Sequence, residues 1–360
     1  MSLKDIWELL VDIHEKTADT PLESVFPILI VLALFYISFR FVLIPVCKGI
    51  KKLYDYFLKK HFIKTKVYHN LSFMEASDIY YAINQYIPTR FSIKDSGYEE
   101  EPVPEYTVVD GEKEQLLLER FLKYEYSIKN GRKYYLCLGD CGMGKTTFLI
   151  NLYYWTLRQH KYKCEFVPLQ ESGHIEKIEK IEKKEETILL LDALDENKDA
   201  LQNYQKFITE LVNATCDFYR VIITARTNFF TNELEEHLPD IRKNSGTTGK
   251  LSDFRKFYIT PFTDEDIQRF LKVRYRLDYK KRKKAWNIVE KNKNLSVRPM
   301  LLRFMDDIIE EAQEFSYDFQ LYECLFRKWI EREKGSLKGE KGKNYIRNAY
   351  LWQRQFMSSG

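Results

Sequence analysis

Apolar positions follow two patterns through the middle of this chain. Short, mostly apolar runs predict buried strands at 134–138, 164–169, 188–191, 220–224 and 257–259. Apolar residues at helical spacing predict amphipathic helices at 112–127, about 146–158, 175–186, 300–309 and 320–333. Strands that alternate with helices are typical of an α/β fold.

The N-terminal pattern is different. Residues 2–16 place apolar side chains on one helical face and predict an amphipathic helix. Residues 25–46 contain Arg40 as their one charge and are long enough to cross about 30 Å of hydrocarbon. Residues 20–23 have the pattern of a capped helix start. We therefore predict one transmembrane helix over 21–47, with a buried core helix as the alternative.

Charges on either side of this apolar run predict its orientation. Acidic residues precede it, and lysines follow at 48, 51, 52, 59, 60, 64 and 66. Basic flanks stay in the cytoplasm. The acidic flank and the absence of a cleavage site argue against a signal peptide. The expected location is the inner or cytoplasmic membrane, single-pass with the N-terminus outside, and the expected lipid contact is 25–46.

Overall composition excludes few function classes. The chain has 360 residues, of which 44% are hydrophobic and 31% charged, enough for one large or two ordinary domains. A net charge of +4 gives no general argument for nucleic-acid binding. The six cysteines lack paired spacing, which favours a reducing compartment with neither disulfides nor a zinc site.

A glycine-rich stretch after the first central strand carries the clearest chemistry. Residues 134–147 read YYLCLGDCGMGKTT and contain the pattern G-x-x-x-x-G-K-[ST] between a predicted strand and helix. The glycines let backbone N–H groups face phosphate oxygens, Lys145 places a charge on the β- and γ-phosphates, and the Thr146 hydroxyl can hold Mg²⁺. The predicted nucleotide-binding residues of this loop are Gly139, Asp140, Cys141, Gly142, Met143, Gly144, Lys145, Thr146 and Thr147.

Carboxylates follow the apolar run 188–191. Asp192 stands at the carboxyl end of the predicted strand, where α/β sheets bind ligands. An aspartate there can complete the Mg²⁺ site with Thr146, and Asp195 or Glu196 can orient the attacking water. A turn or a helix cap is the alternative interpretation of Asp192.

Two basic features are also candidates for function. Arg226 follows the strand 220–224 at the same edge of the sheet and can sense the γ-phosphate, although an exposed surface arginine is the alternative. The run 272–284 contains many lysines and arginines. It predicts either a nucleic-acid patch or, more commonly, a solvated helical face.

The order of these motifs resembles a NACHT-type STAND P-loop NTPase, of the group that includes bacterial anti-phage and animal innate-immune sensors. The resemblance covers roughly 86–333. It rests on the phosphate loop followed by ILLLDALDE, IITAR, PFTDEDIQRFL and SVRPMLL. Its most specific part is 192–196, in which a small residue follows the metal aspartate and an acidic pair comes two residues later.

The resemblance implies roles for individual residues. Lys145 and Thr146 would bind phosphate and Mg²⁺, and Asp192 would complete the metal site. Asp195 or Glu196 would activate water. Arg226 resembles the sensor arginine, and Pro299 resembles the proline that packs near adenine in related switches. ATP or ADP with Mg²⁺ is the implied cofactor set, and a homo-oligomer is the implied active form.

These observations predict an α/β fold: a P-loop NTPase with a parallel five-stranded sheet of the ASCE type, plus a C-terminal helical subdomain, preceded by one transmembrane helix. The predicted divisions are an extracytoplasmic segment 1–20, the transmembrane helix 21–47, a juxtamembrane helical region 48–91, a linker 92–111, the NTPase domain 112–261, a helical subdomain 262–334 and a tail 335–360.

The predicted function is a membrane-anchored ATPase or GTPase switch that couples nucleotide state to oligomerisation, in anti-phage defence. The alternatives are a motor acting on DNA or another polymer, and a nucleotide-binding scaffold. Family members carry a sensor after the helical region, whereas this chain stops at Gly360. We therefore expect that the chain is a fragment, that a sensor or effector partner acts in trans, or that sensing happens through the membrane.

Overall fold

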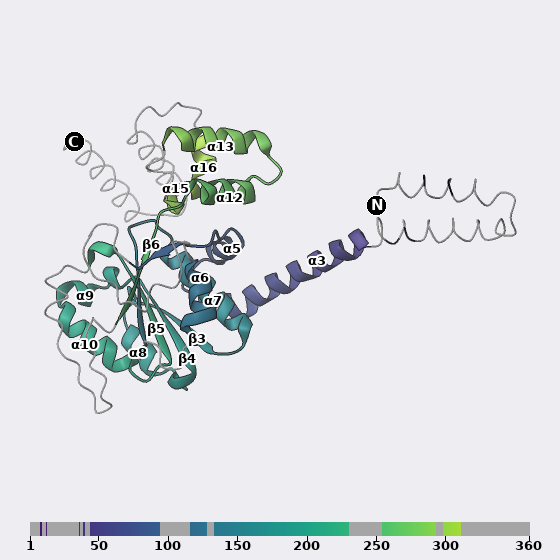
Figure 1. Cartoon of the computed structure of the whole chain (residues 1–360). Helices are drawn as coiled ribbons and strands as arrows, with labels where there is room; N and C mark the ends of the chain where they lie inside the picture. The colour runs from purple at the N-terminus through teal and green to yellow at the C-terminus, as the bar shows by residue number, and fades with distance from the viewer. Residues whose placement is uncertain are drawn as a thin grey trace, which may run out of the picture. The chain divides into compact units, whose positions relative to one another are not determined.

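The structure is a computed structural model of the chain, drawn in Figure 1. The chain falls into two compact units, 1–69 and 70–360. The structure describes Glu8, Asp12, Tyr36, Phe39 and residues 44–93, 116–127, 133–229, 254–292 and 298–310.

The first unit contains one long described helix. Helix α3 (Ile44–Phe62) has no buried residue, and apolar side chains such as Ile50 and Leu53 are exposed on it. A π-helical segment, η3 (Ile63–Val67), and the short helix α4 (Tyr68–Asn70) continue it. The amphipathic helix predicted at 2–16 lies outside the described residues, apart from Glu8 and Asp12.

The membrane prediction is not upheld. Across the part of the chain that the structure describes, no helix combines the length and the apolar character needed to span a bilayer. Most of the predicted span 25–46 lies outside the described residues, and α3 begins only at Ile44 and is rich in lysine. The predicted single-pass location in the inner membrane is therefore wrong on this finding.

The second unit is built on a mixed sheet of six strands, in the order β1-β6-β2-β5-β4-β3. Five neighbouring strands run parallel, and β1 pairs antiparallel with β6 at the edge. The prediction of a five-stranded, wholly parallel sheet is therefore corrected. The strands are β1 (Phe91–Ser92), β2 (Tyr134–Leu138), β3 (Lys163–Pro168), β4 (Thr187–Asp192), β5 (Arg220–Ala225) and β6 (Arg255–Ile259).

The extra strand was missed because two residues are too few to show a period-2 pattern. Phe91 pairs with Ile259, and its ring packs edge-on against Phe257 at 4.8 Å between centroids. Tertiary contacts therefore form β1. Ser92, the first residue of the predicted linker, belongs to this strand, whereas 94–111 lie outside the described residues.

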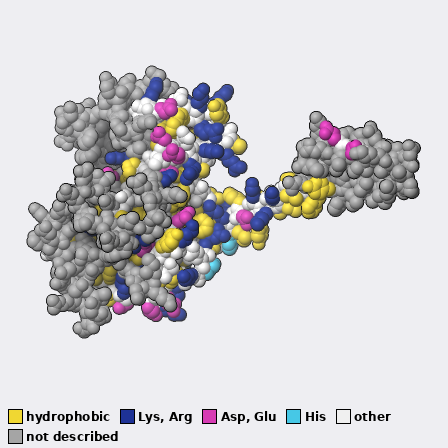
Figure 2. Space-filling view, in the orientation of Figure 1, with side chains coloured by type: hydrophobic (Ala, Val, Ile, Leu, Met, Phe, Trp, Pro, Cys, Tyr) yellow, Lys and Arg dark blue, Asp and Glu magenta, His cyan; other side chains and the backbone are white. Residues whose placement is uncertain are grey.

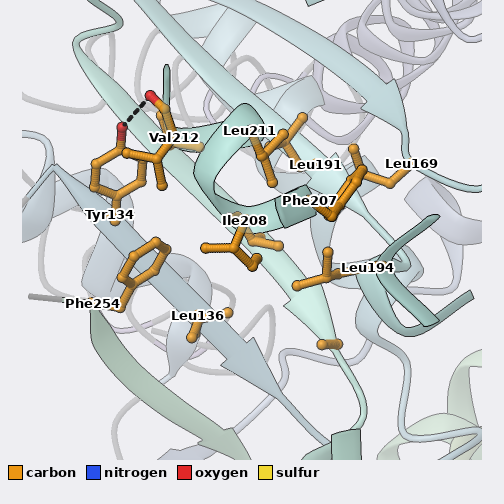
Figure 3. Close-up of a cluster of buried hydrophobic side chains, with 14 of the residues drawn as sticks. Tyr134, Leu136, Leu169, Leu191, Leu194, Phe207, Ile208, Leu211, Val212 and Phe254 are labelled. Carbon is orange, nitrogen blue, oxygen red and sulfur yellow. Dashed lines mark hydrogen bonds between the residues drawn. The ribbon is translucent and has the colours of Figure 1, made fainter. Parts of the chain in front are cut away.

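Helices cover both faces of the sheet, so its central strands β2, β4 and β5 are buried along their whole length. Leu136 on β2 and Leu191 on β4 lie in a cluster with Phe207, Ile208 and other apolar residues of α10 (Figure 3). Tyr135 on the other face of β2 contacts Phe121, which also packs against Phe148 of α7. The two cores hold the phosphate loop between β2 and α7 in place.

Two predicted helices are more broken than expected where the structure describes them. From residue 116 on, the predicted helix 112–127 is α6 followed by a π-helical segment, and the predicted helix 175–186 is α8 followed by a 3₁₀ turn. The predicted helix 320–333 lies outside the described residues. The helical elements of this region are α5 (Ala76–Asn84), α6 (Leu117–Arg120), η5 (Phe121–Glu125), α7 (Lys145–Gln159), α8 (His174–Glu179), η6 (Lys184–Glu186), η7 (Leu194–Glu196), α9 (Lys198–Gln202), α10 (Tyr204–Thr215) and η8 (Thr227–Phe229).

A helical region follows β6. It comprises α12 (Asp264–Arg274), α13 (Tyr279–Lys291), α15 (Pro299–Arg303) and α16 (Met305–Glu310). Its buried cluster includes Phe270, Leu302 and also Ile87, which comes from the segment after α5. Thr263 caps α12 through a capping box with Asp266, and Asp266 also forms an ion pair with Arg90 at 2.8 Å. The segment 85–90 is thereby attached to the helical region.

Candidate functional site

The phosphate loop lies between β2 and α7, as the sequence predicts. Gly142 and Gly144 have φ values of +78° and +90°, which side chains other than glycine rarely adopt. Gly144 is also the N-cap of α7, so that the backbone N–H groups at the start of this helix are directed to the loop. The dipole of a 15-residue helix adds positive potential at the same point. These features favour an anion at the loop.

Lys145 is the first residue of α7 and turns back onto the loop. Its Nζ donates hydrogen bonds to the carbonyl oxygens of Gly139 at 2.7 Å and Asp140 at 3.0 Å. Burial lowers the pKa of Lys145, because the charged form loses hydration there. An anion bound at the loop would therefore lie close to an ammonium group that has lost part of its hydration, and could pair with it.

Thr146 and Asp192 are brought together from two elements. The Thr146 hydroxyl, in the first turn of α7, donates to Asp192 Oδ2 at the end of β4 at 2.7 Å. Asp192 is 8% exposed, and burial raises its pKa, while hydrogen bonds from Thr224 and Thr146 oppose that shift. The pairing places the two predicted Mg²⁺ ligands side by side. Among the described residues, the hydrogen bonds to the Asp192 carboxylate come from hydroxyl groups, whereas a turn or cap would use a backbone N–H.

Asp192 has a second partner, which the sequence analysis did not single out. Thr224 Oγ1 donates to Asp192 Oδ1 at 2.5 Å and accepts a hydrogen bond from the Ala193 N–H at 3.0 Å. Ala193 has φ +60°, a left-handed conformation in which a small side chain causes the least strain. Thr224 therefore fixes both the carboxylate and the strained turn behind it.

Asp195, Glu196 and Arg226 form an ion-pair group beside this turn. Arg226 Nε lies 2.8 Å from Asp195 Oδ2, and its Nη2 lies 3.7 Å from Glu196 Oε1. The backbone N–H of Arg226 also donates to Asp195 Oδ1 at 3.1 Å. Asp195 is 6% exposed, whereas Glu196 is 50% exposed. Asp195 is thus held by the arginine, and Glu196 has the freer carboxylate.

These groups line one cavity of about 350 Å³. Its floor is the phosphate loop with Asp192, Asp195, Glu196 and Arg226, and its remaining walls come from α5, the segment 85–89 and α15. Pro299, predicted near the base, lines it as the first residue of α15. Of the predicted phosphate-loop residues, 141–147 line the cavity, and 139 and 140 offer the carbonyl groups that Lys145 binds.

Direct contacts join the phosphate loop and α5 to the helical region. The Met300 N–H donates to Gly142 O at 3.2 Å, and a Cβ at Gly142 would lie 3.0 Å from Met300 Cβ. Arg303 forms an ion pair with Asp78, and Arg274 donates to the hydroxyl of Tyr81 at 2.8 Å. The cavity is therefore bounded by parts far apart in the sequence.

Residues 124–259 match the family model described as Novel STAND NTPase 3. This part of the chain is a STAND-type P-loop NTPase domain. The predicted STAND family is thereby confirmed, and the NACHT form stays a prediction. P-loop NTPases as a class bind and hydrolyse nucleotides with Mg²⁺, and the loop, Thr146 and Asp192 of this STAND domain match that general requirement.

Other comparisons are more distant. The Orc1 protein of Aeropyrum pernix, solved in complex with DNA, has a TM-score of 0.41 and 14% identity, with 61% of this chain and 66% of that chain covered. The RuvB Holliday junction branch migration motor of Thermotoga maritima has a TM-score of 0.31 and 11% identity, with 54% and 61% covered. The chain thus spans less than two thirds of either protein. No curated protein matches the sequence.

Several residues of the STAND domain's cavity were absent from the sequence prediction. Thr224 sits in the strand run IITAR, two residues before Arg226, so its position at the ligand edge was readable. Asp78, Tyr81 and Gln85 had no such signal. They belong to an ordinary amphipathic helix and its end, and only packing brings them to the cavity.

Proposed function

We propose that this protein is a nucleotide-dependent switch that hydrolyses ATP slowly and couples the nucleotide state to oligomerisation. The observation that carries the proposal is the 2.7 Å hydrogen bond between Thr146 and Asp192 at the floor of the cavity. It joins a hydroxyl from the phosphate loop to a buried carboxylate at the end of β4. That pair, with Lys145 beside it, is the set a Mg²⁺–triphosphate requires.

The residues fit this substrate in their chemistry. Backbone N–H groups of the loop and the start of α7 would bind the phosphate oxygens, and Lys145 would exchange its carbonyl partners for them. The Thr146 hydroxyl and the Asp192 carboxylate are hard oxygen ligands of the kind Mg²⁺ prefers. Bound Mg²⁺ would neutralise charge on the β- and γ-phosphates.

Hydrolysis needs a group that orients water, and Glu196 is the better of the two predicted residues. Asp195 is occupied by the side chain and backbone of Arg226, whereas Glu196 is half-exposed at the cavity. Arg226, 44% exposed, can move from these carboxylates toward a γ-phosphate. Whether Arg226 stays paired with Asp195 would then depend on whether the bound nucleotide has a γ-phosphate.

The switch is supported by what surrounds the cavity. A nucleotide there would contact the phosphate loop, α5 and α15 at once, because all of them line the cavity. The contacts Gly142–Met300 and Asp78–Arg303 join these same parts. Loss of the γ-phosphate would change the position of the helical region relative to the sheet, and with it the surface offered to a second copy.

One observation favours the alternative of a motor on DNA or another polyanion. Figure 2 shows Lys and Arg side chains gathered over the part of the molecule where Figure 1 labels α12 and α13. Within the run 272–284, the exposed basic residues are Lys272, Arg276, Lys280, Lys281, Lys283 and Lys284. Stimulation of ATP turnover by DNA would separate this alternative from a solvated helical face.

Nucleotide content and turnover distinguish the alternatives. The protein would be purified, its bound nucleotide released and identified by chromatography, and ATP turnover measured with and without DNA at low and high salt. Retained ADP, slow turnover and no response to DNA are the results expected of the switch. Rapid, DNA-stimulated turnover with steep salt dependence would favour the motor. Nucleotide binding without turnover would favour a scaffold, and absence of binding would contradict all of them.

A further inference from the structure

Gln85 has an unusual position in the cavity wall. It follows the last residue of α5, and its backbone N–H donates to Tyr81 O at 2.9 Å. Its side chain lines the cavity together with the phosphate loop. Its Oε1 is buried and has no hydrogen-bond partner among the described residues. A buried amide oxygen is costly to leave without a donor, so a ligand or water that supplies one is expected.

The other polar side chains in this wall are already bonded. The Tyr86 hydroxyl lies 3.1 Å from Thr89 Oγ1 and accepts from the Thr89 N–H. Arg274 donates to the Tyr81 hydroxyl, and Asp78 pairs with Arg303. Among these described wall residues, Gln85 is the one whose buried polar atom lacks a hydrogen-bond partner.

The surroundings of Gln85 suit a flat, largely apolar group. Ile87, two residues later, belongs to the buried cluster of the helical region. Phe262, Pro299 and Met300 line the same cavity. A nucleotide base has apolar faces and polar edges, so these side chains can cover its faces while an amide reads its edge.

We propose that the Gln85 amide pairs with the edge of an adenine base. This inference rests on the proposed function and names its base. The terminal torsion of glutamine is broad, so the amide can turn its oxygen toward the cavity. An amide matches adenine by accepting from the exocyclic amine and donating to the adjacent ring nitrogen. Gln85 is then a specificity-determining residue at the opposite end of the ligand from Lys145.

The test compares the parent with Gln85→Met and Gln85→Glu by direct binding of ATP, GTP and inorganic tripolyphosphate. Methionine keeps the size of the side chain and removes both hydrogen bonds. Glutamate offers two acceptors, which suit the two N–H groups of guanine and lose the bond to the ring nitrogen of adenine. The same substitutions at Gln205, an exposed glutamine on α10, are the controls.

Gln85→Met is expected to weaken ATP binding about tenfold while tripolyphosphate binding stays at the parent value. Gln85→Glu is expected to shift the ratio of GTP to ATP affinity toward GTP by about tenfold or more. Parent-like ATP and GTP affinities in both variants would overturn the inference and leave the proposed function standing. A parent that binds neither nucleotide would overturn both, and loss of tripolyphosphate binding in both variants would refute a role confined to the base.

Discussion

The hydroxyl of Thr224 donates to Asp192 Oδ1 at 2.5 Å and at the same time accepts from the backbone N–H of Ala193 at 3.0 Å. One side chain on β5 thus holds both the buried carboxylate of β4 and the left-handed residue that follows it. A second partner, Thr146, binds the other carboxylate oxygen. The orientation of Asp192 is therefore set from two sides.

Replacement of Thr224 by Val, which keeps the shape and removes the hydroxyl, is expected to lower ATP turnover about tenfold to a hundredfold, because Asp192 loses its orienting partner. Turnover as a function of Mg²⁺ concentration measures this effect. Thr224→Ser is expected to restore turnover. Thr209→Val on the exposed side of α10 is the control, and equal turnover of Thr224→Val and the parent would contradict the role.

Lys145→Ala is expected to abolish nucleotide binding, because the buried cation of the loop is lost. Glu196→Gln is expected to bind ATP and stall its hydrolysis, with the melting temperature unchanged because Glu196 is half-exposed. Equilibrium binding, single-turnover hydrolysis and thermal melting measure these effects. Equal hydrolysis by these variants and the parent would refute the site.

Asp195→Asn is expected to differ from Glu196→Gln. Asp195→Asn also slows hydrolysis. In addition, it removes the charge of a carboxylate whose side chain is 6% exposed and whose Oδ2 lies 2.8 Å from Arg226 Nε. The melting temperature should therefore fall, by an amount that corresponds to about 1 kcal/mol or less because Arg226 is substantially exposed. A melting temperature equal to the parent would show that the ion pair contributes nothing to stability.

Gly142→Ala is expected to destabilise the protein and weaken ATP binding. Its φ is +78°, and a Cβ there would lie 3.0 Å from Met300 Cβ, so both the loop and its contact with α15 must shift. Gly173→Ala separates the two causes. Gly173 has φ +75° with no atom within 4 Å of the added Cβ. Thermal melting should show a larger loss for Gly142→Ala, and equal losses would contradict the contact.

Asp192→Asn is expected to stabilise the protein at neutral pH in the absence of nucleotide and Mg²⁺, while it abolishes turnover. Burial raises the pKa of Asp192 in the folded state above its usual 3.8. Between the two values the folded state binds more protons than the unfolded state, so this carboxyl makes the free energy of unfolding fall as pH rises. The free energy of unfolding of the parent and of Asp192→Asn, measured at several pH values, tests this expectation.

The control for that pH series is Asp217→Asn, since Asp217 is exposed. The stability difference between Asp192→Asn and the parent should grow as pH rises from about 3.8 through the raised pKa. A difference that does not change with pH would show that Asp192 ionises in the folded state as it does in the unfolded chain.

Local patterns were sufficient for the floor of the site. The spacing of Gly139, Gly144 and Lys145 within a strand–loop–helix run specifies the phosphate loop without knowledge of distant residues. Asp192 was also predictable, because a carboxylate at the carboxyl end of a buried parallel strand must reach the ligand edge of the sheet. Arg226 follows the strand 220–224, and the same reasoning predicted that it lies at this edge of the sheet.

The walls were not predictable in this way. Gln85 and Asp78 lie on or beside an ordinary amphipathic helix, and their role as cavity lining depends on how α5 packs. The edge strand β1 was missed because its two residues form a strand only by pairing with β6. The membrane span was predicted from hydropathy, a capped helix start and flanking charges, and the described helices do not support it.

The sequence by itself determined the phosphate loop, the α/β class and the STAND-type resemblance, because these depend on residue spacing within segments and on the order of those segments along the chain. The tertiary structure decided which partner holds Asp192, why Asp195 is less free than Glu196, and which side chains close the cavity around Gln85. These properties depend on contacts such as Thr224–Asp192 and Arg226–Asp195 between separate elements. Such contacts follow from packing, and a local pattern contains no information about them.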